Sequence, residues 1–481
     1  MFIPTALAAG LLLPAKPNIV FVLADDLGYG ELGSYGQTKI KTPILDQMAK
    51  EGIRFTDHYS GSPVCAPSRC TLLTGLHTGH AYVRDNYEMG GWGQNEPEGQ
   101  LPLLANTETI ARMLKRNGYV TGVFGKWGLG GPESNGHPNL QGFDEFFGIL
   151  CQRVAHNHYP THLWWNKSIF PLKNPYFSAH QKLIKEPANA KDYDRYQGME
   201  FASDLITDRA IHFIRKNKGK PFFAYVPYPV PHAALQVPND SLKEYENAFE
   251  ETPYLGHKSY LPHRKPRAAY AAMVSRMDKH IGMILSELKK QRLDQNTIVF
   301  FSSDNGPTFN GGTDSAFFRS AGPLRDLKTS VYEGGIRVPL IAKFPGVIKP
   351  GRVSNHVSAF WDFAPTLAEI SGSKWSVPTD GLSFWNELQG KPQKPHEALY
   401  WEFSSGGGKQ AVRFGNYKAV RVQIMKNPSG EIQLFDLSAD IGESNNIAKS
   451  HPELVAKAAK LMSQMRTPSP IRSWNFQKSE R

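Results

Sequence analysis

The chain has 481 residues, of which 40% are hydrophobic and 21% charged, and this composition excludes a disordered or fibrous protein. The length allows a large core with a smaller second domain. The net charge of +11 and the pI of about 9.3 favour an anionic partner, although a solvated basic surface without a partner is the plain alternative. Lysine and arginine are dispersed and form no basic tail, so a small anionic substrate is favoured and no nucleic-acid partner is expected.

The N-terminal segment is apolar and built of small residues. Residues 2–15 resemble the hydrophobic region of a signal peptide, but the positively charged region that normally precedes it is missing. We therefore expect residues 1–15 to be a signal or a degenerate signal, and the protein to be periplasmic or secreted. No later stretch is long and apolar enough to cross a membrane, so no integral membrane segment is expected.

Short apolar runs alternate with helical patterns over residues 16–385, the region that we interpret as the catalytic domain. This alternation predicts an α/β fold with a large, mainly parallel central sheet flanked by helices. The clearest predicted strands are 19–24, 120–124, 222–226, 298–302 and 338–343. The clearest predicted helices are 42–51, 107–117, 201–216 and 268–289.

After about residue 385 the pattern changes to short strands with glycine-rich turns. The predicted strands here are 398–403, 410–413, 417–422 and 431–437, followed by a helix over 452–465. Residues 386–481 are therefore predicted to form a smaller α+β domain with an antiparallel sheet. The segment 404–408 is interpreted as a flexible loop and not as a domain linker.

Polar residues follow several of the predicted strands directly. These residues are Asp25, Asp26, Lys126, His232, Asp304 and Asn305. In open α/β sheets, ligands bind beyond the carboxyl ends of the strands, so these side chains are expected to converge on one crevice. Three carboxylates and one amide oxygen suit a hard cation such as Ca²⁺ or Mg²⁺ better than zinc. The plain alternative is that each acidic pair caps a turn.

Cys65 precedes a segment with helical character. Pro67 suits the first turn of a helix, so a helix is predicted to start there, with Cys65 just before its positive end. Arg69 adds a permanently charged guanidinium group, which can bind a sulfate or a modified side chain through paired hydrogen bonds. From the residues alone, Cys65 is either an activated thiolate or a buried thiol. Three cysteines do not make a disulfide framework, and Cys70 and Cys151 are expected to be buried thiols.

The segment with Cys65, Pro67, Ser68 and Arg69 resembles the signature of type I sulfatases, arylsulfatase-like members of the alkaline phosphatase superfamily whose cysteine is converted to formylglycine. Further blocks match in the family's order. They are residues 71–75, 18–20 with 24–28, 125–127, 303–306, and Lys328 with 333–339. Any one block is weak evidence, but together they are highly specific.

The resemblance implies an alkaline-phosphatase-like fold and hydrolysis of a sulfate ester, on a sulfated carbohydrate in our interpretation. It implies that one divalent cation, usually Ca²⁺ with Mg²⁺ as the other option, is held by Asp25, Asp26, Asp304, Asn305 and modified Cys65. The hydrated aldehyde of residue 65 would offer the hydroxyl that attacks sulfur. It also implies a formylglycine-generating maturation enzyme as a partner.

Other roles carried over by the resemblance concern charge and protons. Arg69, Lys126 and Lys328 would offset the negative charge of the transferring group, and His232 would act as general acid at the bridging oxygen. Without the resemblance, the two lysines could equally be solvated surface residues and His232 a loop histidine.

The sequence departs from many relatives at Gly128, where they carry a histidine that is thought to help break the hemiacetal. His156 and His158 are candidates to replace that histidine or to orient the substrate, and Trp164 is a further candidate for substrate contact. The alternative is that these residues, with Trp165, pack a loop.

Two other functions remain open at the level of sequence. A phosphatase or phosphodiesterase of the same superfamily would normally use serine or threonine as nucleophile and often two metals, and the sequence shows no second His and Asp cluster at strand ends. A glycan-binding pseudo-sulfatase would not need the intact Cys65 motif or the complete set of metal ligands. A sulfatase is therefore favoured over both.

Overall fold

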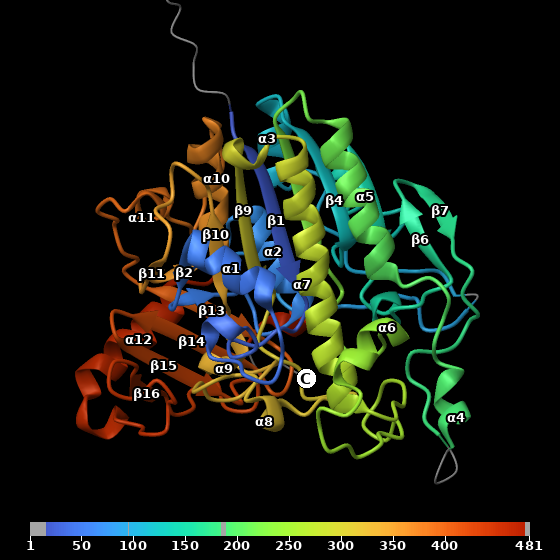
Figure 1. Cartoon of the computed structure of the whole chain (residues 1–481). Helices are drawn as coiled ribbons and strands as arrows, with labels where there is room; N and C mark the ends of the chain where they lie inside the picture. Colours follow the sequence, from blue (N-terminus) through green and yellow to red (C-terminus); the bar gives the residue numbers. More distant parts are fainter. Residues whose placement is uncertain (1–15, 95, 184–188, 477–481) are drawn as a thin grey trace, which may run out of the picture.

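The computed structural model describes residues 16–94, 96–183 and 189–476 (Figure 1). The predicted signal segment, residues 1–15, lies outside the described residues. Among the helices of the described ranges, none is long and apolar enough to cross a membrane.

A ten-stranded sheet runs through the centre of the described chain, in the order β11-β2-β10-β9-β1-β8-β4-β5-β6-β7. In that order its strands are Arg352–Ser354, Ile53–Phe55, Leu340–Lys343, Thr297–Ser303, Asn18–Ala24, Phe222–Pro227, Val120–Lys126, Glu145–Ile149, His162–Trp165 and Ser168–Pro171. The central strands β9, β1, β8, β4 and β5 are all parallel, which confirms the predicted mainly parallel sheet. β10 is antiparallel to both of its neighbours, and β6 and β7 form an antiparallel hairpin at the edge.

Helices cover both faces of this sheet, because its central strands are apolar on both sides. Along β1, Val20 and Val22 belong to one buried cluster, while Ile19 and Phe21 belong to another. The first cluster includes residues of α1 (Pro43–Glu51), α5 (Ala202–Lys216) and α7 (Pro266–Lys290). The second includes residues of α2 (Cys65–Thr74), α3 (Ile110–Arg116) and α10 (Phe363–Ser371).

The C-terminal region forms a second, antiparallel sheet in the described chain, with the order β13-β14-β15-β16. Its strands are Leu399–Phe403, Lys409–Phe414, Tyr417–Val422 and Gln433–Asp436, and the helix α12 covers Pro452–Gln464. One face of this sheet packs on α12, and the other shares a core with Tyr59, Ile336 and Trp361 of the larger part. The α+β character is as expected, and the boundary at residue 385 stays a prediction.

Shorter elements complete the described fold. A two-stranded sheet pairs β3 (His58–Tyr59) with β12 (Ser358–Ala359). The short helices are α4 (Ala190–Asp194), α6 (Asn239–Leu242), α8 (Ser315–Phe318), α9 (Glu333–Ile336) and α11 (Trp385–Gln389).

Candidate active site

The site forms where β1 and β9 end side by side. Ala24, the last residue of β1, lies opposite Ser303, the last residue of β9, in a parallel register. Asp25 and Asp26 therefore leave the sheet at the same edge as Asp304 and Asn305, and all four side chains are buried. The sequence-based expectation of a shared crevice at the strand ends holds for these four residues.

Cys65 is the first residue of α2, and its thiol lies next to Asp25. The helix begins two residues earlier than predicted, because Pro67 sits in the first turn, where its missing N–H has no intrahelical partner to lose. The backbone N–H of Ala66 donates to Oδ1 of Asn86 at 2.9 Å, so a side chain from another loop holds this turn. No local signal in the sequence pointed to Asn86.

The thiol of Cys65 lies among carboxylates and one lysine. Its Sγ is 3.5 Å from Oδ1 of Asp25 and 4.0 Å from Oδ1 of Asp26, and Nζ of Lys328 is 3.6 Å away. Burial, with the charge of Asp25, raises the pKa of the Cys65 thiol above its ordinary range. This favours the buried thiol over the activated thiolate as the state of the unmodified side chain.

Three buried cations balance the three carboxylates. Nζ of Lys126 lies 2.6 Å from Oδ2 of Asp25, and Nζ of Lys328 lies 2.8 Å from Oδ2 of Asp26. Nη2 of Arg69 lies 2.8 Å from Oδ2 of Asp304 and 3.3 Å from Oδ2 of Asp25. Lys126 is fully buried and Lys328 is 11% exposed, so neither is a solvated surface lysine.

The charges of these groups shift one another's protonation. Burial alone would raise the pKa of Asp25, but Lys126, His232 and Arg69 hold it well below its ordinary value. Burial and the neighbouring Asp25 raise the pKa of Asp304 to about 6. Burial alone would lower the pKa of Lys126, and Asp25 restores it to above its ordinary value.

The donor atoms of this cluster fit a hard cation. Asn305 donates from Nδ2 to Oδ1 of Asp26 at 2.7 Å, while its own Oδ1 is buried and has no hydrogen-bond partner within the described part of the chain. A buried, unpaired carbonyl oxygen is costly unless a ligand satisfies it. With the neighbouring carboxylates it makes the oxygen-rich donor set that Ca²⁺ or Mg²⁺ prefers.

The histidines form a layered group next to the carboxylates. Nε2 of His232 lies 3.5 Å from Oδ2 of Asp26, and its Nδ1 donates to the carbonyl of Ala233. The His156 ring is stacked on His232, with centroids 4.9 Å apart and planes 6° apart. Nε2 of His158 donates to the His232 carbonyl at 2.8 Å, so it supports the main chain from behind. Burial, followed by the charge of Lys328, lowers the pKa of His232 to about 3.

Gln152 occupies the space beside Gly128. Gly128 has a φ of +76°, and a Cβ placed on it would lie 2.6 Å from Nε2 of Gln152. Gln152 is buried, and its Nε2 has no hydrogen-bond partner among the residues that the structure describes. The sequence showed that a histidine is missing here, but it did not show which side chain takes the place.

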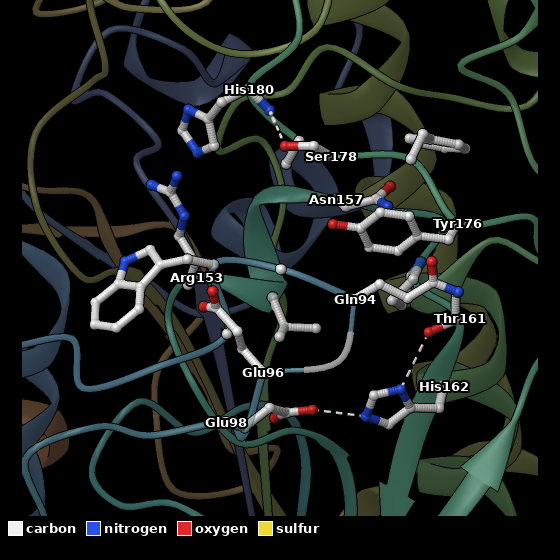
Figure 2. Close-up of a pocket in the computed structure, with 17 residues that line it drawn as sticks. Gln94, Glu96, Glu98, Arg153, Asn157, Thr161, His162, Tyr176, Ser178 and His180 are labelled. Atoms are coloured by element: carbon white, nitrogen blue, oxygen red, sulfur yellow. Dashed lines mark hydrogen bonds and ion pairs between the residues drawn. The ribbon is translucent and has the colours of Figure 1, made fainter.

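Trp164 makes its polar contact away from the cluster around Cys65. Its indole nitrogen on β6 lies 3.3 Å from both carboxylate oxygens of Glu98. Nε2 of His162 lies 2.6 Å from Oε1 of the same glutamate (Figure 2). Trp164 therefore supports Glu98, which lines a pocket next to the site.

A second cluster of potential ligands consists of His77, His80 and Asp380. Nδ1 of His77 accepts a hydrogen bond from the N–H of Gly79 at 3.1 Å, so the ring proton lies on Nε2, which faces Asp380 at 3.6 Å. A histidine that binds a metal through Nε2 needs a free lone pair on Nε2 and carries its proton on Nδ1. His77 has the opposite arrangement, with the proton on Nε2. The cluster is therefore interpreted as a hydrogen-bonded contact that holds the segment of His77 and His80 against Asp380.

The model of the Sulfatase family matches residues 17–373 of this sequence. The chain belongs to the sulfatase family. A second family model, described as N-sulphoglucosamine sulphohydrolase, C-terminal, matches residues 326–468 of this sulfatase.

Curated relatives match nearly the whole sulfatase chain. Arylsulfatase A of Bos taurus is 32% identical over 498 residues, covering 96% of this chain and 89% of the relative. An N-acetylgalactosamine-6-O-sulfatase of Bacteroides thetaiotaomicron is 30% identical over 521 residues, covering 94% of this chain and 93% of the relative.

Solved structures show the same fold. Ps i-CgsB, solved in complex with k-i-k-neocarrahexaose, has a TM-score of 0.75 at 27% identity, covering 97% of this sulfatase and 94% of that chain. The phosphonate monoester hydrolase of Agrobacterium radiobacter has a TM-score of 0.65 at 20% identity, covering 94% and 95%, and this likeness concerns the fold alone.

Proposed function

We propose that this sulfatase removes sulfate from a sulfated carbohydrate, using a formylglycine made from Cys65 and one divalent cation, Ca²⁺ in preference to Mg²⁺. The observation that carries the proposal is the position of Cys65, at the first turn of a buried helix, between carboxylates and the ammonium of Lys328. The carbohydrate part is supported by the relatives, whose names include an N-acetylgalactosamine-6-O-sulfatase, and by the complex of Ps i-CgsB with an oligosaccharide.

The cation would be held by oxygen atoms at the ends of β1 and β9 and by modified residue 65. The proposed protein ligands are Asp25, Asp26, Asp304 and Asn305. A bound cation supplies polarisation of the sulfate and a lowered pKa for a coordinated hydroxyl. The unpaired Oδ1 of Asn305 is the strongest support, since nothing else in the described chain satisfies it.

Residue 65 needs modification, because the unmodified thiol is a poor nucleophile when burial raises its pKa. A hydrated aldehyde at this position supplies two hydroxyls, one to attack sulfur and one whose proton loss lets sulfate leave. This requires a formylglycine-generating enzyme as a partner. A periplasmic or secreted location, where sulfated glycans occur, remains part of the proposal.

Three cations of the chain would hold the sulfate. Arg69, Lys126 and Lys328 already surround the carboxylates, and they lie in a buried site where their charges act strongly on a developing anion. The network fixes their positions before substrate arrives, so little reorganisation is needed during the reaction.

The histidines would divide the proton transfers. We assign the general acid to His232: its Nε2 carries no proton in the free site and would gain one when the sulfate ester binds, since the added negative charge raises its pKa. His158 uses Nε2 on the main chain of His232, so we assign it to positioning. His156 uses Nδ1 toward His180 and is stacked on His232, so it is the candidate that we retain for the base missing at Gly128.

Mass spectrometry of the peptide that contains Cys65, from protein made in its native host, tests the mechanism. We expect an aldehyde at this position and hydrolysis of 4-nitrophenyl sulfate. The Cys65→Ala variant should lose this hydrolysis and keep its fold by circular dichroism. An unmodified thiol, or activity that survives the substitution, would overturn the nucleophile assignment. Cys70→Ala, at another buried thiol of the same helix, is the matched control and should keep activity.

A further inference from the structure

A pocket that is open to solvent is lined by residues on both sides of His156, and Figure 2 shows the residues of its lining. Residues that line it include Trp92, Glu98, Arg153, Asn157, Tyr176 and His180. The proposed reaction uses none of these side chains directly.

The pocket adjoins the catalytic centre through a row of histidine rings, of which one pair is edge-to-face and the other is stacked. The His180 ring contacts His156 with centroids 5.2 Å apart and an Nε2 to Nδ1 distance of 3.0 Å, and His156 in turn is stacked on His232. The short turn Val154–His156 carries His156 toward the active site, while Arg153 and Asn157 on either side of it line the pocket. A ligand that spans both places would therefore pass over His156.

Arg153 is the cation at the end of the pocket nearest the active site. Its side chain is half-buried and is directed toward the His180 ring in Figure 2. Within residues 16–94, 96–183 and 189–476, no carboxylate lies within ion-pair distance of its guanidinium. Burial, followed by the charge of Arg153, lowers the pKa of His180 to about 4, so this neighbour is neutral.

The rest of the pocket offers flat aromatic faces and polar groups. Trp92 is 50% exposed and Tyr176 is 41% exposed, so both leave aromatic surface for a ligand. Two carboxylates line the pocket in the described chain: Glu98 is paired with His162 at 2.6 Å, and Glu96 forms no ion pair among the described residues (Figure 2). Exposed aromatics with a few fixed polar groups are typical of small-ligand sites.

We propose that this pocket binds the sugar next to the one that carries the scissile sulfate, and that Arg153 pairs with an oxyanion on that neighbouring sugar. The oxyanion is a carboxylate or a second sulfate, since the guanidinium fork binds either one through two parallel hydrogen bonds. This inference rests on the proposed function and narrows its substrate class to acidic oligosaccharides.

Competition against 4-nitrophenyl sulfate tests the pocket without requiring turnover of a sugar. The inhibitors are three disaccharides in which 6-O-sulfated N-acetylgalactosamine is joined to galactose, to glucuronic acid or to a sulfated galactose. For the wild-type enzyme we expect the two acidic disaccharides to inhibit about tenfold more strongly than the neutral one. The Arg153→Gln variant should remove this difference while keeping hydrolysis of 4-nitrophenyl sulfate. Comparing inhibition by the glucuronic acid and the sulfated galactose disaccharides shows which oxyanion the pocket prefers.

Matched variants separate the pocket from general effects. Trp92→Ala should weaken inhibition by all three disaccharides to the same extent, because it removes an aromatic face and no charge. Arg264→Gln, at an exposed arginine in a different cavity, should change none of the inhibition constants. If Arg153→Gln leaves the preference intact, or if no disaccharide inhibits the wild type, this inference is wrong. Failure of the wild type to hydrolyse 4-nitrophenyl sulfate would instead count against the proposed function.

Discussion

Gly128 shows how one residue determines which side chains can carry the chemistry. Its φ of +76° is a left-handed conformation, and Nε2 of Gln152 lies 2.6 Å from where a Cβ would be. We expect Gly128→His to destabilise the protein by about 2–4 kcal/mol, from backbone strain together with overpacking, and to give no faster turnover. Chemical denaturation and 4-nitrophenyl sulfate kinetics measure the two effects.

Gly118 provides the matched control for this substitution. Its φ is +83°, and no atom lies within 4 Å of a Cβ placed there. Gly118→His should therefore lower the free energy of unfolding only by the backbone strain of the left-handed conformation, about 1–2 kcal/mol. Adding Gln152→Ala to the Gly128→His variant should recover part of its stability. Faster turnover in Gly128→His would show that the site still accepts a histidine at this position.

Asn305 provides a test of the cation that does not depend on activity. Because its buried Oδ1 has no partner in the described chain, we expect Ca²⁺ to raise the unfolding midpoint and a chelator to lower it. At one hundred times the dissociation constant, Ca²⁺ stabilises the folded state by about 2.7 kcal/mol. Asn305→Ala should lose most of this increment, as measured by thermal unfolding with and without Ca²⁺.

Asn139 is the matched control, since its Oδ1 is also buried and unpaired within the described ranges, and it lies before the start of β5 and not at the carboxyl ends of β1 and β9. Asn139→Ala should lower stability but keep the full Ca²⁺ increment. An increment that survives in Asn305→Ala would remove this side chain from the proposed ligands.

At the scale of elements, the first turn of α2 is held from outside the helix. Asn86 accepts from the Ala66 N–H at 2.9 Å, and the preceding residue, Asp85, accepts from Ser404 and Ser405 in the loop between β13 and β14. We expect Asn86→Ala to cost about 1 kcal/mol and to lower kcat by about tenfold with little change in KM, because Cys65 is displaced. Steady-state kinetics and denaturation measure both.

Thr109 gives the comparison for this prediction. It caps α3 by accepting from the Arg112 N–H at 3.1 Å, in a helix that carries no proposed site residue. Thr109→Ala should cost a similar amount of stability and leave kcat unchanged. If both variants lower kcat equally, the effect of Asn86 is on stability alone.

The elements also show what sequence patterns could and could not predict. β1 and β9 were predictable because each is a local apolar run ended by acidic residues, and parallel pairing then brings Asp25 and Asp304 together. The direction of β10 was not predictable from its own residues, because pairing between distant strands decides it. Asn86 and Gln152 were missed for the same reason, since each acts on a residue brought close only by tertiary packing.

At the scale of the whole molecule, a buried ion pair joins the C-terminal sheet to α9 of the larger part. Lys418 on β15 lies 2.8 Å from Glu333 of α9 and 3.1 Å from Glu443, and all three side chains are buried. Glu333 also contacts Arg337 at 3.0 Å, so it keeps one cation if Lys418 is removed, whereas Glu443 then has no side-chain cation partner among the described residues. We expect Lys418→Met to cost about 3–5 kcal/mol, because it leaves a buried carboxylate without its partner. Denaturation at pH 8 measures this loss.

The pH dependence identifies the cause of that loss. Burial already raises the pKa of Glu443 from 4.5 to about 7, against the opposing charge of Lys418, so its ionisation costs stability as the pH rises through about 7. Without Lys418 this pKa rises further, and the pKa of Glu333, which Lys418 and Arg337 hold at about 2 against burial, rises as well. The deficit of Lys418→Met should therefore be large at pH 8 and much smaller at pH 5, where Glu443 binds a proton. Lys115→Met is the control, because it breaks an exposed pair with Asp144. It should lower the free energy of unfolding by at most about 1 kcal/mol at pH 8. A deficit for Lys418→Met that is equal at both pH values would show that lost packing, and not the unpaired charge, destabilises the contact between the C-terminal sheet and α9.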